Sequence, residues 1–292
     1  MSNATQTEIG AVVSLWRYPV KSMLGEELHT AQVGDYGLLG DRAYALLDGA
    51  DGKVATAKNP RKWPHLFAFR ATFTEPPGSG AQWPPVRITL PDGTVITSTH
   101  NELNQVLSQV FNRQVTLAAT AATERGQVGG VQSSVPASWT GYAEEYWPDM
   151  AGLDHRDTVT DFALPTGTFF DCATVHLLTT ATLNRLRDFY TQGRFEVQRF
   201  RPNIVVDPAV DAPGFAENAW IGHTLAIGDE VRLHITGPCG RCVMTTLAQG
   251  DLPQDSEILR TAVQHNQGHV GVYAAVVQGG TIRRGDRVRL GV

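Results

Sequence analysis

Alternation of hydrophobic and polar positions dominates the first third of this 292-residue chain. Residues 9–20 alternate and end at a proline, which is typical of a strand that stops at a turn. The Asp-Gly pairs at 51–52 and 92–93 are typical of hairpin turns. Further runs of the same kind predict strands at 27–33, 41–48, 66–73 and 85–90.

The hydrophobic period changes at 100–112. There Leu103, Val106, Leu107 and Val110 recur every three or four residues, which is the spacing of an amphipathic helix. The first part of the chain is therefore predicted to be a β-rich unit with one helix.

Composition divides the chain into two domains. Residues 118–150 are rich in Ala, Thr, Gly and Ser and then read GYAEEYWPDM, which indicates a linker or a long surface connection. We predict a first domain over 1–120, a connecting segment over 121–150 and a second domain over 151–292.

Strand patterns also dominate the second domain. Residues 175–180 read as a strand, and a helix with Thr180 as its N-cap is expected directly after it. Few helices separate the strands that follow, so a barrel or sandwich is favoured over a parallel α/β sheet. The further strands are expected at 204–210, 223–237 and 270–277, with two short ones within 279–292.

Composition excludes several classes of protein. A net charge of −5 argues against a general nucleic-acid or anionic-membrane surface, which needs a basic field. The polar N-terminus does not resemble a secretory signal, and no run of about 18 apolar residues predicts a membrane span. Three cysteines without framework spacing fit a reducing compartment, so we expect a cytoplasmic protein. From its charge and hydropathy we expect no membrane partner.

Two of those cysteines, Cys239 and Cys242, stand close together in GPCGRCVMTT. The spacing suits a redox disulfide, half of a zinc site, a catalytic thiol or a metal thiolate. A structural zinc site needs four ligands, and only Cys172 with His234 and His265 could complete a mixed one. A thioredoxin-type motif should open a helix, whereas the residues that follow favour a strand.

The two cysteines have different neighbours in the sequence. Cys239 is interpreted as a small buried hydrophobe, because free cysteine is among the most buried residue types. Arg241 could stabilise a thiolate at Cys242, and the glycines around it make a tight loop that can expose one. Cys242 is therefore the candidate for chemistry.

Separate short motifs carry donors that suit an anion. Lys21 and Ser22 follow a strand in a turn, and Arg42 follows Gly-Asp in another. Arg201 precedes a proline and should be extended, which would place it on the same face as Asn203. Each motif taken alone is also compatible with a solvated side chain or an exposed ion pair.

Taken together and in order, four motifs resemble the MOSC proteins, the family related to the C-terminal domain of molybdenum cofactor sulfurase. They are Tyr-Pro-Val-Lys-Ser at 18–22, Gly-Asp-Arg at 40–42, Phe-Arg-Pro-Asn-Ile at 200–204 and Arg-Cys-Val-Met-Thr-Thr at 241–246. The resemblance runs from residue 9 to the end. Its nearest subgroup is the mitochondrial amidoxime-reducing component with its bacterial relatives.

The resemblance implies a mainly β protein with a few helices, in which an N-terminal β-barrel-like domain precedes the MOSC β-barrel. It implies a molybdenum cofactor, with the metal held by a pyranopterin dithiolene and by Cys242. Cys239 is not a metal ligand in that family. The resemblance places the cofactor phosphate on Lys21 and Ser22, and further contacts on Arg42, Thr179, Thr180, Arg201, Asn203 and Arg241.

The activity implied is a molybdenum-dependent oxidoreductase that reduces N-hydroxylated small molecules by oxygen-atom transfer to molybdenum. Amidoximes, hydroxylamines and N-hydroxylated bases are the expected substrates. No cysteine follows Cys242, so no cysteine-bound iron–sulfur cluster is expected there, and a separate ferredoxin- or flavoprotein-type electron donor is implied. The alternatives are a carrier of molybdenum cofactor or sulfur that acts through Cys242, and a CxxC redox protein or binding module.

Overall fold

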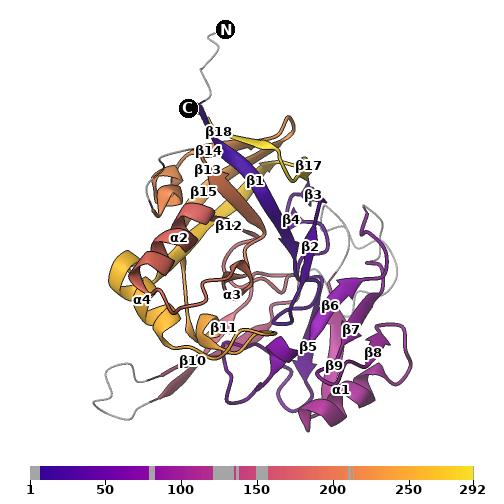
Figure 1. Ribbon diagram of the computed structural model, residues 1–292. Coiled ribbons are helices and arrows are strands. Elements are labelled where there is room, and N and C mark those ends of the chain that lie inside the picture. Colours follow the sequence, from indigo (N-terminus) through magenta and orange to yellow (C-terminus); the bar gives the residue numbers. More distant parts are fainter. Residues whose placement is uncertain are drawn as a thin grey trace.

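A computed structural model of the chain describes residues 7–78, 83–120, 135, 138–148, 157–209, 212 and 214–291. Within these ranges the fold is mostly β, with four α-helices and three short 3-10 helices. Two β-rich parts lie side by side, the larger at the top of Figure 1 and the smaller at its lower right. The expectation of a mainly β protein with few helices is confirmed.

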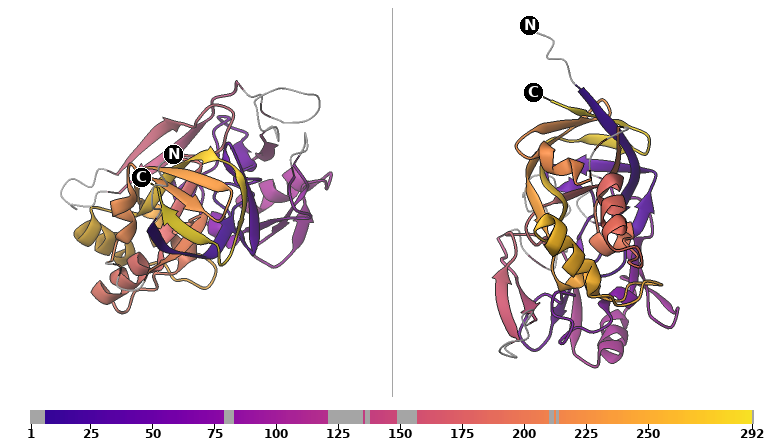
Figure 2. Two further views of the ribbon diagram at one scale, coloured as in Figure 1. Left: turned by 90° about the horizontal axis from the view of Figure 1, so that it is seen from above. Right: turned by 60° about the vertical axis from the view of Figure 1, so that its left-hand side comes forward.

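Seven strands close into a barrel, whose ring is seen from above in Figure 2. Neighbouring strands are antiparallel, except that β12 and β13 run parallel and are joined through two helices. The barrel predicted from the sequence is therefore confirmed. Around the ring the strands are β1 (Thr7–Arg17), β13 (Ile204–Pro208), β12 (Val175–Thr179), β16 (His269–Gln278), β15 (Val231–Gly240), β14 (Thr224–Ile227) and β18 (Arg287–Leu290).

The first strands of the chain belong to this barrel. β1 pairs with β13 and β18, and its last residues, 15–17, pair with β2 (Glu26–Leu28). β3 (Thr30–Gly34) pairs with β4 (Gly37–Leu38) and with β17 (Gly280–Arg283). Strand pairing therefore crosses the domain boundary expected near residue 120.

The smaller part contains most of the remaining N-terminal elements. The predicted turn at 92–93 joins two paired strands, whereas the turn at 51–52 is followed only by an isolated bridge between Leu47 and Val54. The predicted strand at 66–73 begins instead as the 3-10 turn η1 (Leu66–Ala68). The elements are β5 (Tyr44–Asp48), β6 (Arg70–Phe73), β7 (Val86–Thr89), β8 (Val95–Thr97), β9 (Val115–Ala119) and α1 (Leu103–Phe111).

A two-stranded ribbon occupies part of the region expected to be a connection. β10 (Tyr142–Trp147) pairs with β11 (Thr158–Ala163) over six residue pairs. The remainder of the expected segment 121–150 lies outside the described residues, apart from 135, 138–141 and 148. The segment therefore contributes regular structure, and its place beside the smaller part is visible in Figure 1.

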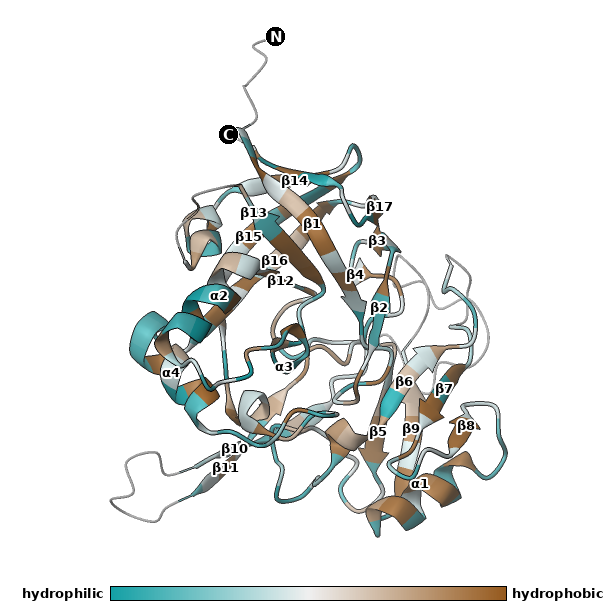
Figure 3. Ribbon diagram, viewed as in Figure 1, coloured by the Kyte–Doolittle hydropathy of each residue, from teal (hydrophilic) through white to brown (hydrophobic). Residues whose placement is uncertain are grey.

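Separate hydrophobic clusters fill the two parts. The strands that face the barrel interior contribute one cluster, while Trp63, Phe69 and Leu107 belong to another in the smaller part. In Figure 3 the outer faces of α2 and α4 are largely hydrophilic, as expected for helices that cover one side of a sheet.

No helix among the described residues is long and apolar enough to cross a membrane. The helical elements are α2 (Thr180–Phe189), α3 (Val197–Phe200), η2 (Ala216–Trp220), η3 (Val243–Thr246) and α4 (Glu257–Asn266).

Candidate functional site

A pocket of about 370 Å³, lined by several charged side chains, lies where the barrel meets the smaller part. Its walls come from segments that are far apart in the sequence. Of the nine site residues predicted from the sequence, the pocket brings seven together: Lys21, Ser22, Arg42, Arg201, Asn203, Arg241 and Cys242.

The turn after β1 places Lys21 and Ser22 in this pocket. The Lys21 amide donates to the Tyr44 carbonyl (2.8 Å), which ties the turn to β5. The Lys21 ammonium donates to the Phe169 carbonyl (2.8 Å) and pairs with Asp171. Burial lowers the pKa of Lys21, although the Asp171 carboxylate partly opposes this. An anion in the pocket would stabilise the charged ammonium further.

Arg42 and Arg201 lie against the same tyrosine. Their guanidinium carbons are 4.7 and 4.1 Å from the centre of the Tyr18 ring. Arg42 pairs with the buried Asp41, so the turn at 40–42 is not the exposed ion pair that was the alternative prediction. Burial and the neighbouring Arg42 lower the pKa of Arg201 to about 10. Two adjacent guanidinium groups in one cavity favour an anionic ligand.

The backbone of Arg201 differs from its prediction. The residue has φ 52° and ψ 46°, in the left-handed region, and is not extended. It ends helix α3, and its amide donates to the Val197 carbonyl (3.2 Å), a capping role that overrides the preference set by the following proline. The argument that Arg201 and Asn203 share a strand face was therefore wrong, although both line the pocket.

Three residues with strained backbone line the pocket. Seven non-glycine residues of the described chain have positive φ, and Ser22, Arg42 and Arg201 are three of them. Such conformations are costly for residues with a Cβ atom and occur preferentially at functional sites. The three donors are therefore held in place by the surrounding fold.

Asn203 lines the pocket but uses its amide within the protein. Its side-chain nitrogen donates to Asp41 (2.8 Å), and its oxygen accepts from the His176 amide (3.0 Å). Its direct role is to position neighbouring segments.

Cys242 begins a tight turn after β15. The sequence favoured a strand for the residues that follow, but Val243–Thr246 form the 3-10 turn η3. The reason is local: the Thr245 hydroxyl donates to the Cys242 carbonyl (3.0 Å). The fully buried Arg199 donates to the carbonyls of Thr245 (3.3 Å) and Leu247 (3.2 Å), which holds the turn in place.

The two cysteines of the pair have opposite electrostatic environments. The Arg241 guanidinium donates to the sulfur of Cys239 (2.8 Å). Burial would raise the pKa of Cys239, but Arg241 and His176 outweigh it and lower the pKa to about 6. At Cys242 burial outweighs the effects of Lys58 and Arg241, and the pKa is raised. Cys239 is thus not merely a small buried hydrophobe, and Arg241 bonds to it directly.

Thr179 and Thr180 do not reach the pocket. Thr179, and not the expected Thr180, caps helix α2, because its hydroxyl accepts from the Thr182 amide (3.2 Å). Its hydroxyl also donates to the buried Glu217 carboxylate (2.5 Å). Thr180 is bonded to Asp207 outside the pocket. An acidic side chain therefore already occupies the start of this helix.

Several residues of the pocket were not predicted from the sequence. His176 and Tyr273 are cross-strand partners in β12 and β16, and their polar side chains in hydrophobic strands were an available signal. A Cβ at Gly271, which has φ 83°, would lie 2.3 Å from His176 Nε2, so the glycine leaves room for the imidazole. The remaining unpredicted polar or aromatic residues of the wall include Lys58, Glu145, Trp147 and Asp171.

Neither a disulfide nor a zinc site is formed by the cysteine pair among the described residues. Cys172, Cys239 and Cys242 are all free thiols. Within the described ranges, no group of three or more His, Cys, Asp or Glu side chains is arranged to hold a metal ion. Protein side chains alone therefore do not form the mixed zinc site considered above.

The charges around the pocket decide which ligands fit. Five cationic side chains line it, against the two carboxylates of Glu145 and Asp171. Lys21 and Lys58 outweigh the effect of burial and hold the pKa of Asp171 well below its usual range. The pocket is therefore locally basic in a protein whose net charge is −5. The five cations are Lys21, Arg42, Lys58, Arg201 and Arg241.

Comparison with known proteins identifies two domains. The family described as the MOSC N-terminal beta barrel domain matches residues 9–126, and the MOSC domain matches residues 165–289. Mitochondrial amidoxime reducing component 2 of Rattus norvegicus is 25% identical over an alignment of 304 residues. The alignment covers 96% of this chain and 83% of that protein.

Solved structures with detectable likeness are more distant. The YuaD protein from Bacillus subtilis is 12% identical, with a TM-score of 0.46, and the match covers 98% of this chain and 97% of that one. YiiM from Geobacillus stearothermophilus is also 12% identical, with a TM-score of 0.32, over 52% of this chain and 72% of that one.

Proposed function

Because this chain belongs to the MOSC-domain family, we propose that its basic pocket binds a molybdenum cofactor and that the protein is an oxidoreductase for N-hydroxylated compounds. Amidoximes, hydroxylamines and N-hydroxylated bases are the substrate class. The printed name of the rat relative, an amidoxime reducing component, supports this class. The carrying observation is the convergence of five cations and one turn-held cysteine on a single cavity.

The donor set fits a phosphorylated pterin with a sulfur-bound metal. The Nε of Arg241 is one of the buried side-chain polar atoms of the described residues that have no hydrogen-bond partner, so it is available to a ligand. Lys21 and Ser22 would hold the phosphate, with Arg42 and Arg201 beside them. Cys242 would ligate the metal, because a thiolate suits a metal that is already bound by dithiolene sulfurs.

The cofactor, when bound, supplies two-electron redox chemistry at molybdenum by which an N–O bond is reduced. The residues of this chain would bind the cofactor and orient it. Arg199 and the threonines of η3 fix the backbone that carries Cys242. Coordination would keep the Cys242 thiolate deprotonated, although burial alone raises its pKa. The electrons would come from a separate ferredoxin- or flavoprotein-type donor.

The alternative, a carrier of cofactor or sulfur that acts through Cys242, has less support. A persulfide carrier needs a nucleophilic thiolate, and burial raises the pKa of free Cys242. Persulfide found on Cys242 by mass spectrometry in metal-free protein would favour the carrier.

The test uses the full chain produced in a host that makes molybdenum cofactor and in a matched host that cannot. Purified protein from the competent host should contain molybdenum and should reduce an aromatic amidoxime to the amidine with a reduced viologen as donor. Protein from the deficient host should do neither. Metal-free protein from the competent host, or equal activity from both, would contradict the proposal.

A further inference from the structure

One part of the pocket wall comes from a segment that lies outside both matched domains. Glu145 and Trp147 line the pocket, and both belong to β10, between residue 126 and residue 165. Because they are two residues apart on a strand, they lie on the same face of the ribbon. The ribbon therefore presents one carboxylate and one indole to the cavity.

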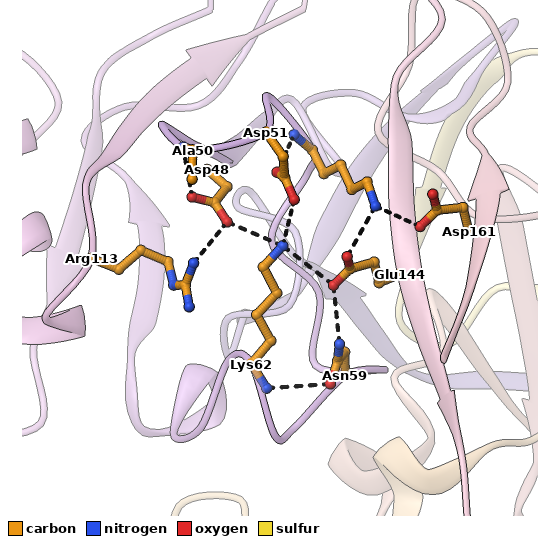
Figure 4. Close-up of polar contacts among 9 residues, drawn as sticks. Asp48, Ala50, Asp51, Asn59, Lys62, Arg113, Glu144 and Asp161 are labelled. Carbon is orange, nitrogen blue, oxygen red and sulfur yellow. Dashed lines mark hydrogen bonds and ion pairs between the residues drawn. The ribbon is translucent and has the colours of Figure 1, made fainter. Parts of the chain in front are cut away.

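The opposite face of the ribbon is anchored by charged side chains, which Figure 4 shows. Glu144 accepts from Lys53 (3.0 Å), from Asn59 (3.1 Å) and, as an ion pair, from Lys62 (3.3 Å). Lys53 also bonds to Asp161 on β11 (2.8 Å). Such a network holds the ribbon in a defined position beside the pocket.

Backbone contacts add to this anchoring. The Tyr146 amide donates to the Lys58 carbonyl (2.9 Å), and the Val54 amide donates to the Tyr142 carbonyl (2.8 Å). Groups on a fixed strand recognise a ligand without a large ordering cost, so the pocket-facing side chains of the ribbon are preorganised.

Trp147 is held but its ring is not covered. Its indole N–H donates to the Thr160 hydroxyl (2.9 Å), which fixes the ring orientation, while half of the residue stays exposed. A fixed, half-exposed indole in a cavity wall offers a face on which a planar group can stack, and a planar cation gains most from it.

Glu145 complements this with a negative charge. Among the described residues, Glu145 forms an ion pair with Lys58 (3.7 Å). Lys58 also pairs with Asp171 (3.4 Å). The ribbon side of the pocket is therefore aromatic and carries one carboxylate, whereas Lys21, Arg201 and Arg241 lie elsewhere on its wall. This arrangement suits a flat, positively charged group that lies against the ribbon.

Reduction of an amidoxime creates such a group. The N–O bond breaks, two electrons from the reduced donor protein and two protons are consumed, and the oxygen leaves as water. The amidine that remains is far more basic than the amidoxime and takes up a further proton as a planar amidinium. A carboxylate next to the group stabilises the positive charge that develops during this reaction.

Resting on the proposed function, we propose that Glu145 and Trp147 select amidine-type substrates. These are amidoximes and N-hydroxyguanidines, whose products are planar cations. Alkyl hydroxylamines give products without a planar, delocalised cation and gain little from the indole. The ribbon between the two domains is thus the specificity element of the site.

The test compares substrates and variants of the holoprotein. Trp147→Ala should lower kcat for an aromatic amidoxime about tenfold, which is the size of a good cation–ring contact, because the planar cation forms only during the reduction. Its kcat/KM for a small alkyl hydroxylamine should stay unchanged. Glu145→Gln should lower kcat for the amidoxime selectively. Tyr142→Ala, a half-exposed aromatic on the other face of the same strand, is the matched control and should behave as wild type.

A binding measurement separates this inference from the proposed function. An aromatic amidine should bind the wild-type chain in calorimetry, and Trp147→Ala and Glu145→Gln should each weaken binding, unlike Tyr142→Ala. If the wild type binds the amidine through these residues but reduces no amidoxime, the proposed function fails and the recognition site stands. If it reduces amidoximes and the variants lose both substrates equally or neither, the inference is overturned.

Discussion

The pocket and the start of helix α2 both carry donors that the sequence assigned to an anion, yet their chemistry differs. At the start of α2, Thr179 caps its own helix and Glu217 accepts from Thr179 and Thr182. In the pocket, Arg241 keeps a buried N–H without a partner, and Arg201 lies beside another cation. Donors indicate a ligand where the protein itself does not satisfy them.

The largest expected effect comes from removing the proposed metal ligand. Cys242→Ala should lose molybdenum and reduce its amidoxime-reducing activity to background, because the metal would have no protein thiolate. Molybdenum per chain and viologen-driven turnover measure this. Cys239→Ala, three residues earlier and at the end of β15, is the matched control and should retain the metal. Retention of full metal and activity in Cys242→Ala would refute the assignment.

A smaller effect concerns the other cysteine of the pair. The pKa of Cys239 is about 6 in the folded chain and near 9 when unfolded. The thiolate's contribution to stability is therefore fully present above about pH 9 and is lost as the pH falls to 6. Urea unfolding of cofactor-free protein should show wild type losing stability relative to Cys239→Ser as the pH falls through this range, by on the order of a few kcal/mol.

The control for this pH effect is Cys172→Ser, which removes the exposed cysteine. Its stability difference from wild type should vary little between pH 6 and 9. A difference between wild type and Cys239→Ser that is equally flat would mean that Arg241 and His176 do not stabilise a thiolate at this position.

The smallest effect is expected at the start of α2. Thr179→Val removes the cap of the helix and the hydroxyl that bonds Glu217, so the free energy of unfolding should fall by about 1 kcal/mol. Cofactor content should not change, because the residue is outside the pocket. Loss of pterin from a Thr179→Val protein that remains folded would show that the helix start takes part in binding.

Local patterns in the sequence predicted most of the barrel. Alternation located β1, β12, β13 and β16, and the 3.6-residue period located α1. α4 was missed, although Ile258, Leu259 and Ala262 of that helix are buried. The closure of the barrel by β1 could not be read locally, because its partners β13 and β18 are nearly two hundred or more residues away.

The candidate site was predictable in part. Motifs supplied seven of the residues that line the pocket, but not how each is used. The Asn203 side chain is hydrogen-bonded to Asp41 and His176. Arg201 adopts a left-handed, helix-capping conformation, whereas the proline that follows it predicted an extended one. The roles of Lys58 and Asp171 depend on tertiary ion pairing, which no spacing in the sequence encodes.

The central claim is that the basic pocket, and not the start of α2, holds the cofactor. The most direct test is the pterin content per chain of Lys21→Met beside Thr180→Ala, with equal melting temperatures confirming that both fold. Loss of a charge-assisted contact should weaken retention by about tenfold or more in Lys21→Met. Thr180→Ala should match wild type. Full pterin in Lys21→Met together with loss in Thr180→Ala would contradict the account.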